Sequence, residues 1–195
     1  MSTLYRLMYL LGFTPWDAVR PDELREFIEG PTSLPPGRAL DLGSGKGAKA
    51  IYMAGHGWKV TAVENVPRAL AQARKRAEEA HVNVDFRLGD VTRLSDLGLE
   101  PGYTFLFDFG CFHGLNAAQR DAYVQGVRPV AAPGAILLMM AFTRALPPVP
   151  VGVSESELME RFGQEWKLLW SHPDRSAGTS AMNRAAASWF CLSRR

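Results

Sequence analysis

Short apolar runs alternate with amphipathic stretches along most of the chain. Seven runs predict strands, over residues 38–43, 59–64, 84–90, 103–109, 135–142, 165–172 and 187–194. Helical periodicity and capping residues predict helices over 46–55, 65–80 and 116–127, and a further helix that begins at the Ser154–Glu157 capping box. Helices between successive strands are typical of βαβ crossovers, so a parallel sheet is expected.

Two features of these runs refine the predicted sheet. Residues 105–107 (FLF) and 135–140 (AILLMM) are apolar at every position, which indicates strands covered by helices on both faces. Only the last two strands lack a helix between them, so the final strand is expected to run antiparallel to the rest. The prediction is a doubly wound, seven-stranded α/β sheet with a helical N-terminal extension, in one domain of 195 residues.

Residues 1–30 precede the first strand and are expected to form a helical cap. Leu4, Leu7, Met8 and Leu11 share one face of a helix. The apolar run within this segment is too short for a signal peptide, and no small-residue cleavage site follows it. Because no stretch reaches the roughly 18 apolar residues that cross a bilayer, no membrane partner is expected.

Composition and charge exclude several classes of protein. Hydrophobic residues make up 47% of the chain and charged residues 22%, as in ordinary globular proteins. A formal net charge of +2 is too small to indicate a nucleic-acid partner. The two cysteines, Cys111 and Cys191, form neither a CxxC pair nor a metal-ligand spacing. A reducing, cytoplasmic setting and no metal ion are therefore expected, while the oligomeric state stays open.

Three glycines follow the first predicted strand within five residues. Gly43, Gly45 and Gly47 allow a bound molecule to approach main-chain N–H groups at the start of the next helix. Taken alone, this loop also fits a tight turn without a ligand, or a loose dinucleotide-binding pattern. The acids at neighbouring strand ends narrow the choice.

Three carboxylates stand where three predicted strands end. Asp41 is suited to an ammonium group, whereas a pyrophosphate-binding loop has no use for a carboxylate there. Glu64 can accept hydrogen bonds from both hydroxyls of a ribose, and it would repel a 2′-phosphate. Asp90 is placed to accept from the exocyclic amine of an adenine. A ligand with an ammonium group, a ribose diol and an adenine but no phosphate is S-adenosylmethionine.

The segments ALDLGSGKG, VTAVE, GDV, FDFGCFHGL and APGAILLMMAF resemble the successive motifs of class I S-adenosylmethionine-dependent methyltransferases, which have a Rossmann-like fold. The resemblance covers about residues 15–195 and is closest to the small-molecule branch with thiopurine-type and tellurite-resistance-type enzymes. Lys46, Thr104 and Ala135 depart from the usual pattern. The resemblance implies that the cofactor is bound by Trp16, Asp41, Gly43, Ser44, Gly45, Glu64, Asn65, Asp90, Val91, Asp108 and Phe109.

The turn after the fourth strand, residues 108–114, is expected to lie beside the transferred methyl group. His113 is either the general base that deprotonates the acceptor or a residue that shapes the loop through the backbone. Asp108 is either a positioning acid or a strand-end carboxylate satisfied within the fold. Phe109 packs on the cofactor or in the core, and Cys111 is interpreted as a packed thiol.

The acceptor is expected to be a small, partly apolar or aromatic molecule, bound by the N-terminal cap and by a proline-rich lid loop over residues 143–153. The aromatic residues of the cap are also compatible with a purely structural core. Arg6 and Arg20 are alternative partners for an acidic acceptor group. The candidate substrate-binding residues are Tyr5, Tyr9, Phe13, Phe112 and Arg144.

The predicted activity is transfer of a methyl group from S-adenosylmethionine to an oxygen, nitrogen or sulfur atom of such an acceptor, with S-adenosylhomocysteine as the product. One alternative is a protein that binds the cofactor without catalysis. A second is an NAD-dependent oxidoreductase on the same sheet topology, which Asp41 argues against.

Overall fold

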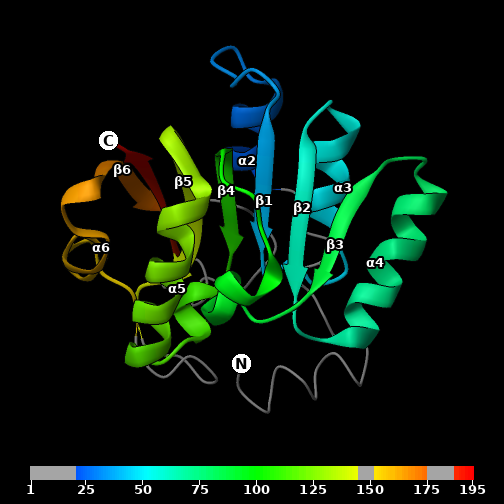
Figure 1. The fold of residues 1–195 in the computed structure, drawn as a ribbon. Coiled ribbons are helices and arrows are strands. Elements are labelled where there is room, and N and C mark those ends of the chain that lie inside the picture. Colours follow the sequence, from blue (N-terminus) through cyan, green and yellow to red (C-terminus); the bar gives the residue numbers. More distant parts are fainter. Residues whose placement is uncertain (1–20, 145–151, 175–186) are drawn as a thin grey trace.

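The computed structural model describes residues 21–144, 152–174 and 187–195. Its centre is a seven-stranded sheet of order β3-β2-β1-β4-β5-β7-β6 (Figure 1). The strands are β1 (Arg38–Leu42), β2 (Lys59–Glu64), β3 (Val84–Leu88), β4 (Tyr103–Phe109), β5 (Ala131–Phe142), β6 (Trp166–Pro173) and β7 (Ala187–Arg194). The first five strands pair in parallel, and β7 runs antiparallel to both β5 and β6. The predicted Rossmann-like topology, with its antiparallel last strand, is confirmed.

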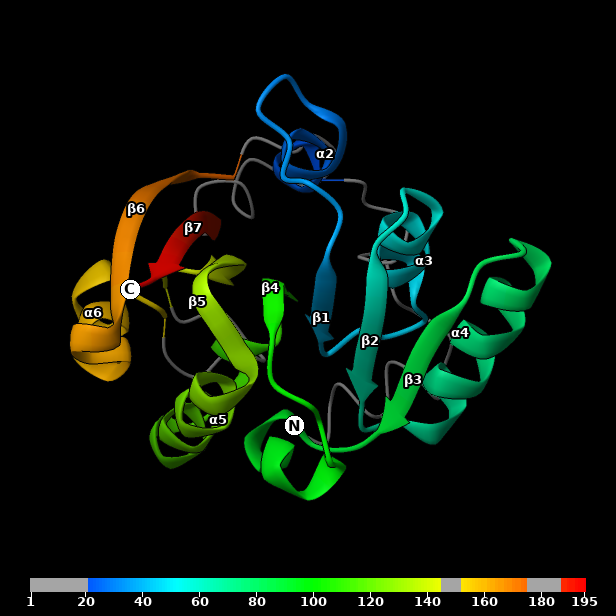
Figure 2. The ribbon, with the colours of Figure 1, turned by 45° about the horizontal axis from the view of Figure 1, so that its top comes forward.

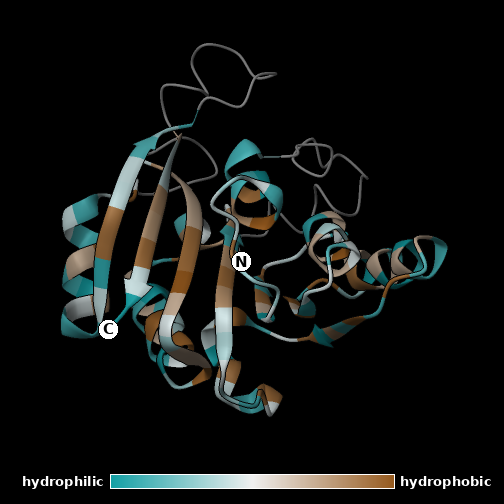
Figure 3. Ribbon diagram, turned by 90° about the horizontal axis from the view of Figure 1, so that it is seen from above, coloured by the Kyte–Doolittle hydropathy of each residue, from teal (hydrophilic) through white to brown (hydrophobic). Residues whose placement is uncertain are grey.

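Helices cover both faces of the sheet (Figure 2). One apolar cluster packs α2 (Asp22–Glu29), α3 (Ala48–Gly55) and α4 (Pro67–Glu79) against the sheet. A second cluster packs the 3-10 segment η2 (Val91–Leu97), α5 (Ala117–Val130) and α6 (Glu155–Phe162) on the opposite face. Short 3-10 turns η3 (Phe112–Gly114) and η4 (Gly163–Glu165) complete the described elements. Apolar residues gather on the central strands between these layers (Figure 3).

Several predicted boundaries move for identifiable reasons. Helix α3 begins at Ala48 because Gly45 and Gly47 have φ of 57° and 78°, outside the helical region. Asn65 was expected to cap α4, but the N-cap is Val66 and makes no side-chain cap bond. Strand β5 begins at Ala131, four residues before the predicted start at residue 135. Residues 91–97, without an expected element, form η2.

Two of the expected caps are present. Asn116 accepts from the Gln119 N–H at 3.0 Å, and the Gln119 side chain accepts from the Asn116 N–H, which forms a complete capping box. Ser154 accepts from the Glu157 N–H at 3.1 Å at the start of α6. The Glu157 carboxylate binds Arg120 and Arg161.

Arg120 joins the helical layer to the turn after β4. Its side chain is buried and donates to both Glu157 oxygens, at 2.8 and 2.7 Å. It also donates to the carbonyl oxygens of Leu115 at 3.1 Å and His113 at 3.3 Å. A buried guanidinium with this set of partners fixes the backbone of the turn that follows β4.

We expect Arg120→Met to lower the free energy of unfolding by about 3–5 kcal/mol, because the substitution removes one partner of a buried ion pair and two hydrogen bonds to backbone carbonyls. Urea unfolding followed by circular dichroism measures the change. Arg93→Met is the control, since Arg93 forms an exposed i,i+3 pair with Asp96 and should change stability by less than about 1 kcal/mol. A similar loss of stability in Arg120→Met and Arg93→Met would show that the buried contacts of Arg120 do not stabilise the fold.

Candidate functional site at the carboxyl ends of the strands

The glycine loop connects β1 to α3 at the edge where the parallel strands end. The N–H groups of Gly43 and Ser44 both donate to the Val63 carbonyl, at 2.9 and 3.0 Å. Gly43 has φ of 80°, and a Cβ there would lie 2.8 Å from the Cβ and Sγ of Cys111. Glycine is therefore required for the backbone turn and for the close approach of the turn that follows β4.

Glu64 at the end of β2 is buried and holds the loop in place. Its Oε2 accepts from the Gly45 N–H at 2.9 Å, and its Oε1 accepts from the Val66 N–H at 2.8 Å. A carboxylate offers about four lone-pair sites, so these two backbone donors do not by themselves saturate Glu64. The strand-end acid and the glycine loop form one hydrogen-bonded unit.

Asp41 is a buried acid at the end of β1. Burial raises the pKa of its carboxyl group to about 7, the Lys49 charge opposes this shift, and the charges of Asp108 and Glu64 add to it. Lys49, in the first turn of α3, is itself buried. Its Nζ lies 4.7 Å from the centroid of the Phe109 ring.

Three buried polar atoms at this edge have no hydrogen-bond partner within the described ranges. They are Asp41 Oδ2, Ser44 Oγ and Asn65 Oδ1. Buried polar atoms are nearly always hydrogen-bonded in folded proteins, because leaving one unpaired costs about 1–3 kcal/mol. Their grouping around the glycine loop is what a ligand-binding site requires, since a polar ligand supplies the missing partners.

Asp90 follows β3 and caps the 3-10 segment η2. Its Oδ1 accepts from the Thr92 N–H at 2.9 Å and from the Thr92 hydroxyl at 2.8 Å. The side chain is only partly buried, and Val91 next to it is buried in the core. The Asp90 carboxylate is thus fixed in orientation at the same edge as Asp41 and Glu64.

Asp108 is fully buried and accepts from three protein groups. Its Oδ1 accepts from the Cys111 N–H at 2.8 Å, and its Oδ2 from the Phe112 N–H at 3.1 Å and the Tyr123 hydroxyl at 2.9 Å. Burial raises its pKa to about 7 against these hydrogen bonds. Of the two interpretations of Asp108, a positioning acid and a strand-end carboxylate satisfied within the fold, the geometry supports the second.

His113 is buried and bonded to the backbone. The Phe142 N–H donates to its Nδ1 at 3.1 Å, and the two rings are 4.7 Å apart. Burial, followed by the Arg120 charge, lowers the pKa of His113 to about 3, so the imidazole is neutral at physiological pH. With Nδ1 accepting, the neutral ring carries its proton on Nε2 and presents a donor there. This arrangement supports the loop-shaping interpretation.

Four residues form a row across the sheet near the carboxyl ends of β4, β5 and β6. Phe109 pairs with Met140, Met140 with Trp189, and Trp189 with His172. The Phe109 and Trp189 ring centroids are 5.8 Å apart. We call Phe109, Met140, Trp189 and His172 the edge row; it lies on the face of the sheet that α2 and α3 cover.

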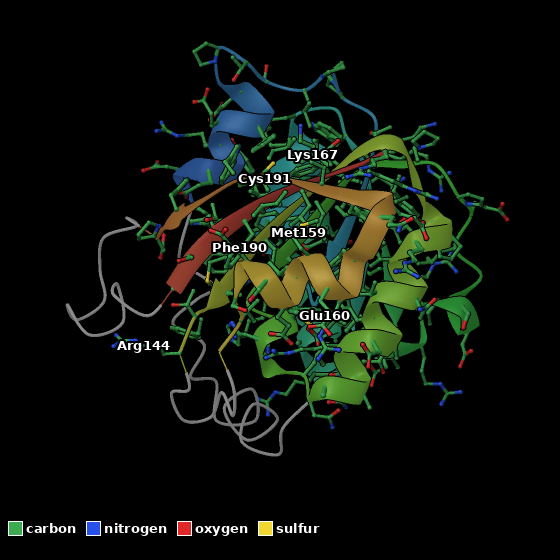
Figure 4. The ribbon with its side chains drawn as sticks, turned by 90° about the vertical axis from the view of Figure 1, so that its left-hand side faces the viewer. Arg144, Met159, Glu160, Lys167, Phe190 and Cys191 are labelled. Atoms are coloured by element: carbon green, nitrogen blue, oxygen red, sulfur yellow. The ribbon has the colours of Figure 1, made fainter. Side chains whose placement is uncertain are left out.

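The structure places the other predicted substrate-binding residues in different locations. Phe112 packs in the core on the α5 face, against Tyr123 and Phe162, and is not brought to the edge row. Arg144 is exposed just beyond β5, apart from α6 (Figure 4). Four further predicted residues and most of the predicted lid loop lie outside the described residues; the four are Trp16, Tyr5, Tyr9 and Phe13.

Sequence reasoning missed Lys49, Trp189, His172 and Glu23. Glu23, at the start of α2, has its Oε1 4.0 Å from His172 Nε2. The register of β7 with β5 and β6 places Trp189 and His172 in the edge row, and the packing of α2 on β6 brings Glu23 to them; no local motif marks either arrangement. Only Lys49, one turn after the glycine loop, carried a local signal, as a charged residue in an otherwise apolar helix segment.

Comparison with known proteins agrees with this geometry. The methyltransferase-domain family matches residues 39–134. The 2-heptyl-1-hydroxyquinolin-4(1H)-one methyltransferase of Mycobacteroides abscessus is 31% identical over 160 residues, which cover 79% of this chain and 69% of that protein. The probable S-adenosyl-L-methionine-dependent methyltransferase TehB of Haemophilus influenzae is 23% identical and covers 74% of this chain and 51% of that protein.

A solved structure supports the fold independently. The 1,6-didemethyltoxoflavin-N1-methyltransferase of Burkholderia thailandensis superposes with a TM-score of 0.76 at 17% identity, over 99% of this chain and 86% of that one. The sheet order and the strand-end acids thus define a class I methyltransferase fold. The chain belongs to the methyltransferase-domain family and is an S-adenosylmethionine-dependent methyltransferase.

Two kinds of feature are absent from the described ranges. No helix there is long and apolar enough to span a bilayer. No group of three or more His, Cys, Asp or Glu side chains in the same ranges is arranged to hold a metal ion.

The raised pKa of Asp41 predicts how stability depends on pH. A buried acid with a raised pKa binds its proton more tightly in the folded state than in the unfolded chain, whose value is near 3.8. The stability of the unligated protein should therefore fall as pH rises from about 4 through about 7. We expect Asp41→Asn to remove part of this fall, with a gain of about 1–3 kcal/mol at pH 8 that vanishes near pH 4.

Thermal or urea unfolding across this pH range tests the prediction. Asp85→Asn is the control, because Asp85 is exposed on β3 beside Arg87. If the pH curves of Asp41→Asn and the wild type run parallel, Asp41 is not the buried acid that titrates in this range.

Proposed function

We propose that this enzyme methylates an oxygen, nitrogen or sulfur atom of a small acceptor with an aromatic or partly apolar body. The observation that carries this proposal is the edge row, an apolar and aromatic strip beside the unpaired polar atoms of the glycine loop. A binding site of this kind combines apolar walls with a few fixed polar groups, as small-molecule sites do.

The residues that would hold S-adenosylmethionine follow from the chemistry of the edge. Asp41 and Lys49 place a carboxylate and an ammonium side by side, which suits the zwitterionic amino-acid end of the cofactor. Glu64 retains acceptor capacity for the ribose hydroxyls, and Asp90 for the adenine amine. The unpaired atoms of Ser44 and Asn65 lie in the loops that these acids flank.

The acceptor class rests on the edge row and on the relatives. Phe109, Met140 and Trp189 offer ring and thioether surface for an aromatic body. The relative from Mycobacteroides abscessus is named for a hydroxyquinolone, and the Burkholderia thailandensis structure for didemethyltoxoflavin. Both names describe small heterocycles, which supports this class. The cytoplasmic location and the lack of a nucleic-acid or membrane partner remain expectations from composition.

The residues around the turn after β4 orient the acceptor rather than react with it. When bound, the cofactor supplies an electrophilic methyl group. Asp108 and Tyr123 fix the turn after β4, and Arg120 donates a hydrogen bond to the backbone of this turn. His113 ties this turn to the end of β5 through the Phe142 N–H. Such bonds keep the acceptor surface rigid, and in-line displacement at a methyl group depends strongly on alignment.

The alternative is a protein that binds the cofactor without turning it over. A panel of phenols, N-hydroxy heterocycles, heterocyclic amines and thiols separates the two, with release of S-adenosylhomocysteine as the readout. We expect turnover with at least one aromatic acceptor and tight binding of S-adenosylhomocysteine by calorimetry. Binding without turnover on the whole panel would support the non-catalytic alternative, and absence of binding would contradict both.

The role of His113 gives a separate prediction. Because its Nδ1 accepts a backbone N–H, we expect His113→Ala to destabilise the protein by about 1–3 kcal/mol. Turnover should fall by a similar factor for a weakly acidic and a strongly acidic acceptor. Unfolding curves and steady-state kinetics with the two acceptors measure this. A loss of about 10²–10⁴-fold confined to the weakly acidic acceptor, with unchanged stability, would show that His113 is the base.

A further inference from the structure

The reaction still requires a group that accepts the acceptor's proton. His113 presents a donor at Nε2, and the Asp108 oxygens are engaged by the turn and by Tyr123. Asp41 and Glu64 belong to the proposed cofactor site. Among the described residues, one further pair of proton-accepting groups stands at the edge row. It is formed by Glu23 and His172.

His172 belongs to the edge row through strand register. It pairs with Trp189, which pairs with Met140, which in turn pairs with Phe109 at the end of β4. Its ring stacks on Trp170, with centroids 5.0 Å apart and an interplanar angle of 14°. The imidazole therefore stands at the same edge and on the same face as the surface proposed for the acceptor, at the β6 end of the row.

The hydrogen bonds of His172 define which ring nitrogen carries the proton. Its Nδ1 lies 3.0 Å from the carbonyl oxygen of Pro173, and a carbonyl only accepts, so Nδ1 must donate. In the neutral ring this leaves Nε2 as an acceptor. Nε2 lies 4.0 Å from Glu23 Oε1, which is too far for a direct hydrogen bond but close enough for electrostatic interaction between the two groups.

Glu23 reaches this position from the first turn of α2. Its side chain is only 11% exposed. Its Oε2 is buried without a hydrogen-bond partner among the described residues. The charged groups that face it are His172 and Asp174 from the end of β6 and Asp22 from its own helix. Burial raises the pKa of Glu23, and the Asp174 charge adds to this, which makes it a stronger base than an exposed glutamate.

Asp174 helps to fix the position of β6 in addition to placing a negative charge near Glu23. It accepts from the Trp189 indole N–H at 3.0 Å, which ties the end of β6 to the centre of the edge row. A carboxylate placed only to join α2 to β6 would not need a buried, unpaired oxygen.

We propose that Glu23 and His172 form the proton-accepting pair that deprotonates the acceptor during methyl transfer. The acceptor's O–H, N–H or S–H proton passes to this pair. The freed electron pair forms the bond to the methyl carbon, and the carbon–sulfur bond breaks with its electrons going to sulfur. The proton then leaves to solvent. This inference rests on the proposed function. It applies to acceptors whose O–H, N–H or S–H group is only weakly acidic before binding.

The chain provides a matched control pair. Glu29 lies on the same helix as Glu23, and its Oε2 is 3.2 Å from His56 Nε2. That pair is more exposed and stands near the C-terminal end of α3, at the opposite edge of the sheet from the edge row. Substitutions there remove the same types of group without touching the proposed site.

The test compares Glu23→Gln and His172→Gln with Glu29→Gln and His56→Gln. The substrates are a phenol and a thiol that the wild type methylates, at a pH where the thiol is ionised. We expect Glu23→Gln to lower turnover of the phenol by about 10²–10⁴-fold and that of the thiol much less. The loss should shrink as pH approaches the pKa of the phenol, while affinity for S-adenosylhomocysteine stays unchanged. The control variants should behave as wild type.

Equal losses for both acceptors, or a loss no larger than in Glu29→Gln, would overturn the proposal. If Glu23→Gln does not fold, His172→Gln gives the same comparison. If the wild type binds S-adenosylhomocysteine but methylates nothing, the proposed function has failed, and the pair is tested by NMR of the imidazole nitrogens. A proton on Nδ1 of His172, with Nε2 responding to Glu23→Gln, supports the pair; a proton on Nε2 alone overturns it.

Discussion

The site depends on Asp41, a buried carboxylate with one oxygen to which no described residue donates a hydrogen bond. Asp41 lies near the end of strand β1 and is flanked by the acids Asp108 and Glu64. Such a group costs stability, because desolvation opposes its charged form. The nearby charge of Lys49 offsets only part of this cost, since the pKa of Asp41 remains about 7. A ligand with an ammonium group offsets the rest.

The rest of the edge is built to keep that carboxylate in place. Glu64 joins the glycine loop to β2 through the Gly45 and Val66 N–H groups. Asp108 organises the turn after β4, whose Cys111 packs against Gly43. The loop proposed to bind the cofactor and the turn proposed to lie beside the acceptor are thus in direct contact. A change on one side of the site is therefore expected to affect the other.

Much of the fold could be predicted from the sequence because its signals are local. Fully apolar runs predicted buried parallel strands, and the missing helix before β7 predicted its antiparallel direction. The strand-end acids could be placed at one edge because parallel strands end together. The cap of α4 was wrong because the choice between Asn65 and Val66 depends on how Glu64 bonds to Val66.

The roles of several site residues could not be predicted, because they depend on contacts between distant segments. The part that Asp108 plays is decided by Tyr123, which lies on another element. The edge row depends on three strand registers, and Glu23 approaches His172 only because α2 packs over β6. Phe112 illustrates the same point, since its neighbours Tyr123 and Phe162 place it in the core.

The central claim is that Asp41 receives the ammonium group of the cofactor. Calorimetry of S-adenosylhomocysteine binding, in buffers of different ionisation enthalpy, tests it most directly by counting the protons that binding releases. With a pKa of about 7 before binding, Asp41 should release about half a proton at pH 7 when the ammonium group arrives, close to one near pH 6 and almost none at pH 9. This release should disappear in Asp41→Asn. Tight binding with no proton release at pH 7, or the same release in Asp41→Asn, would contradict the account.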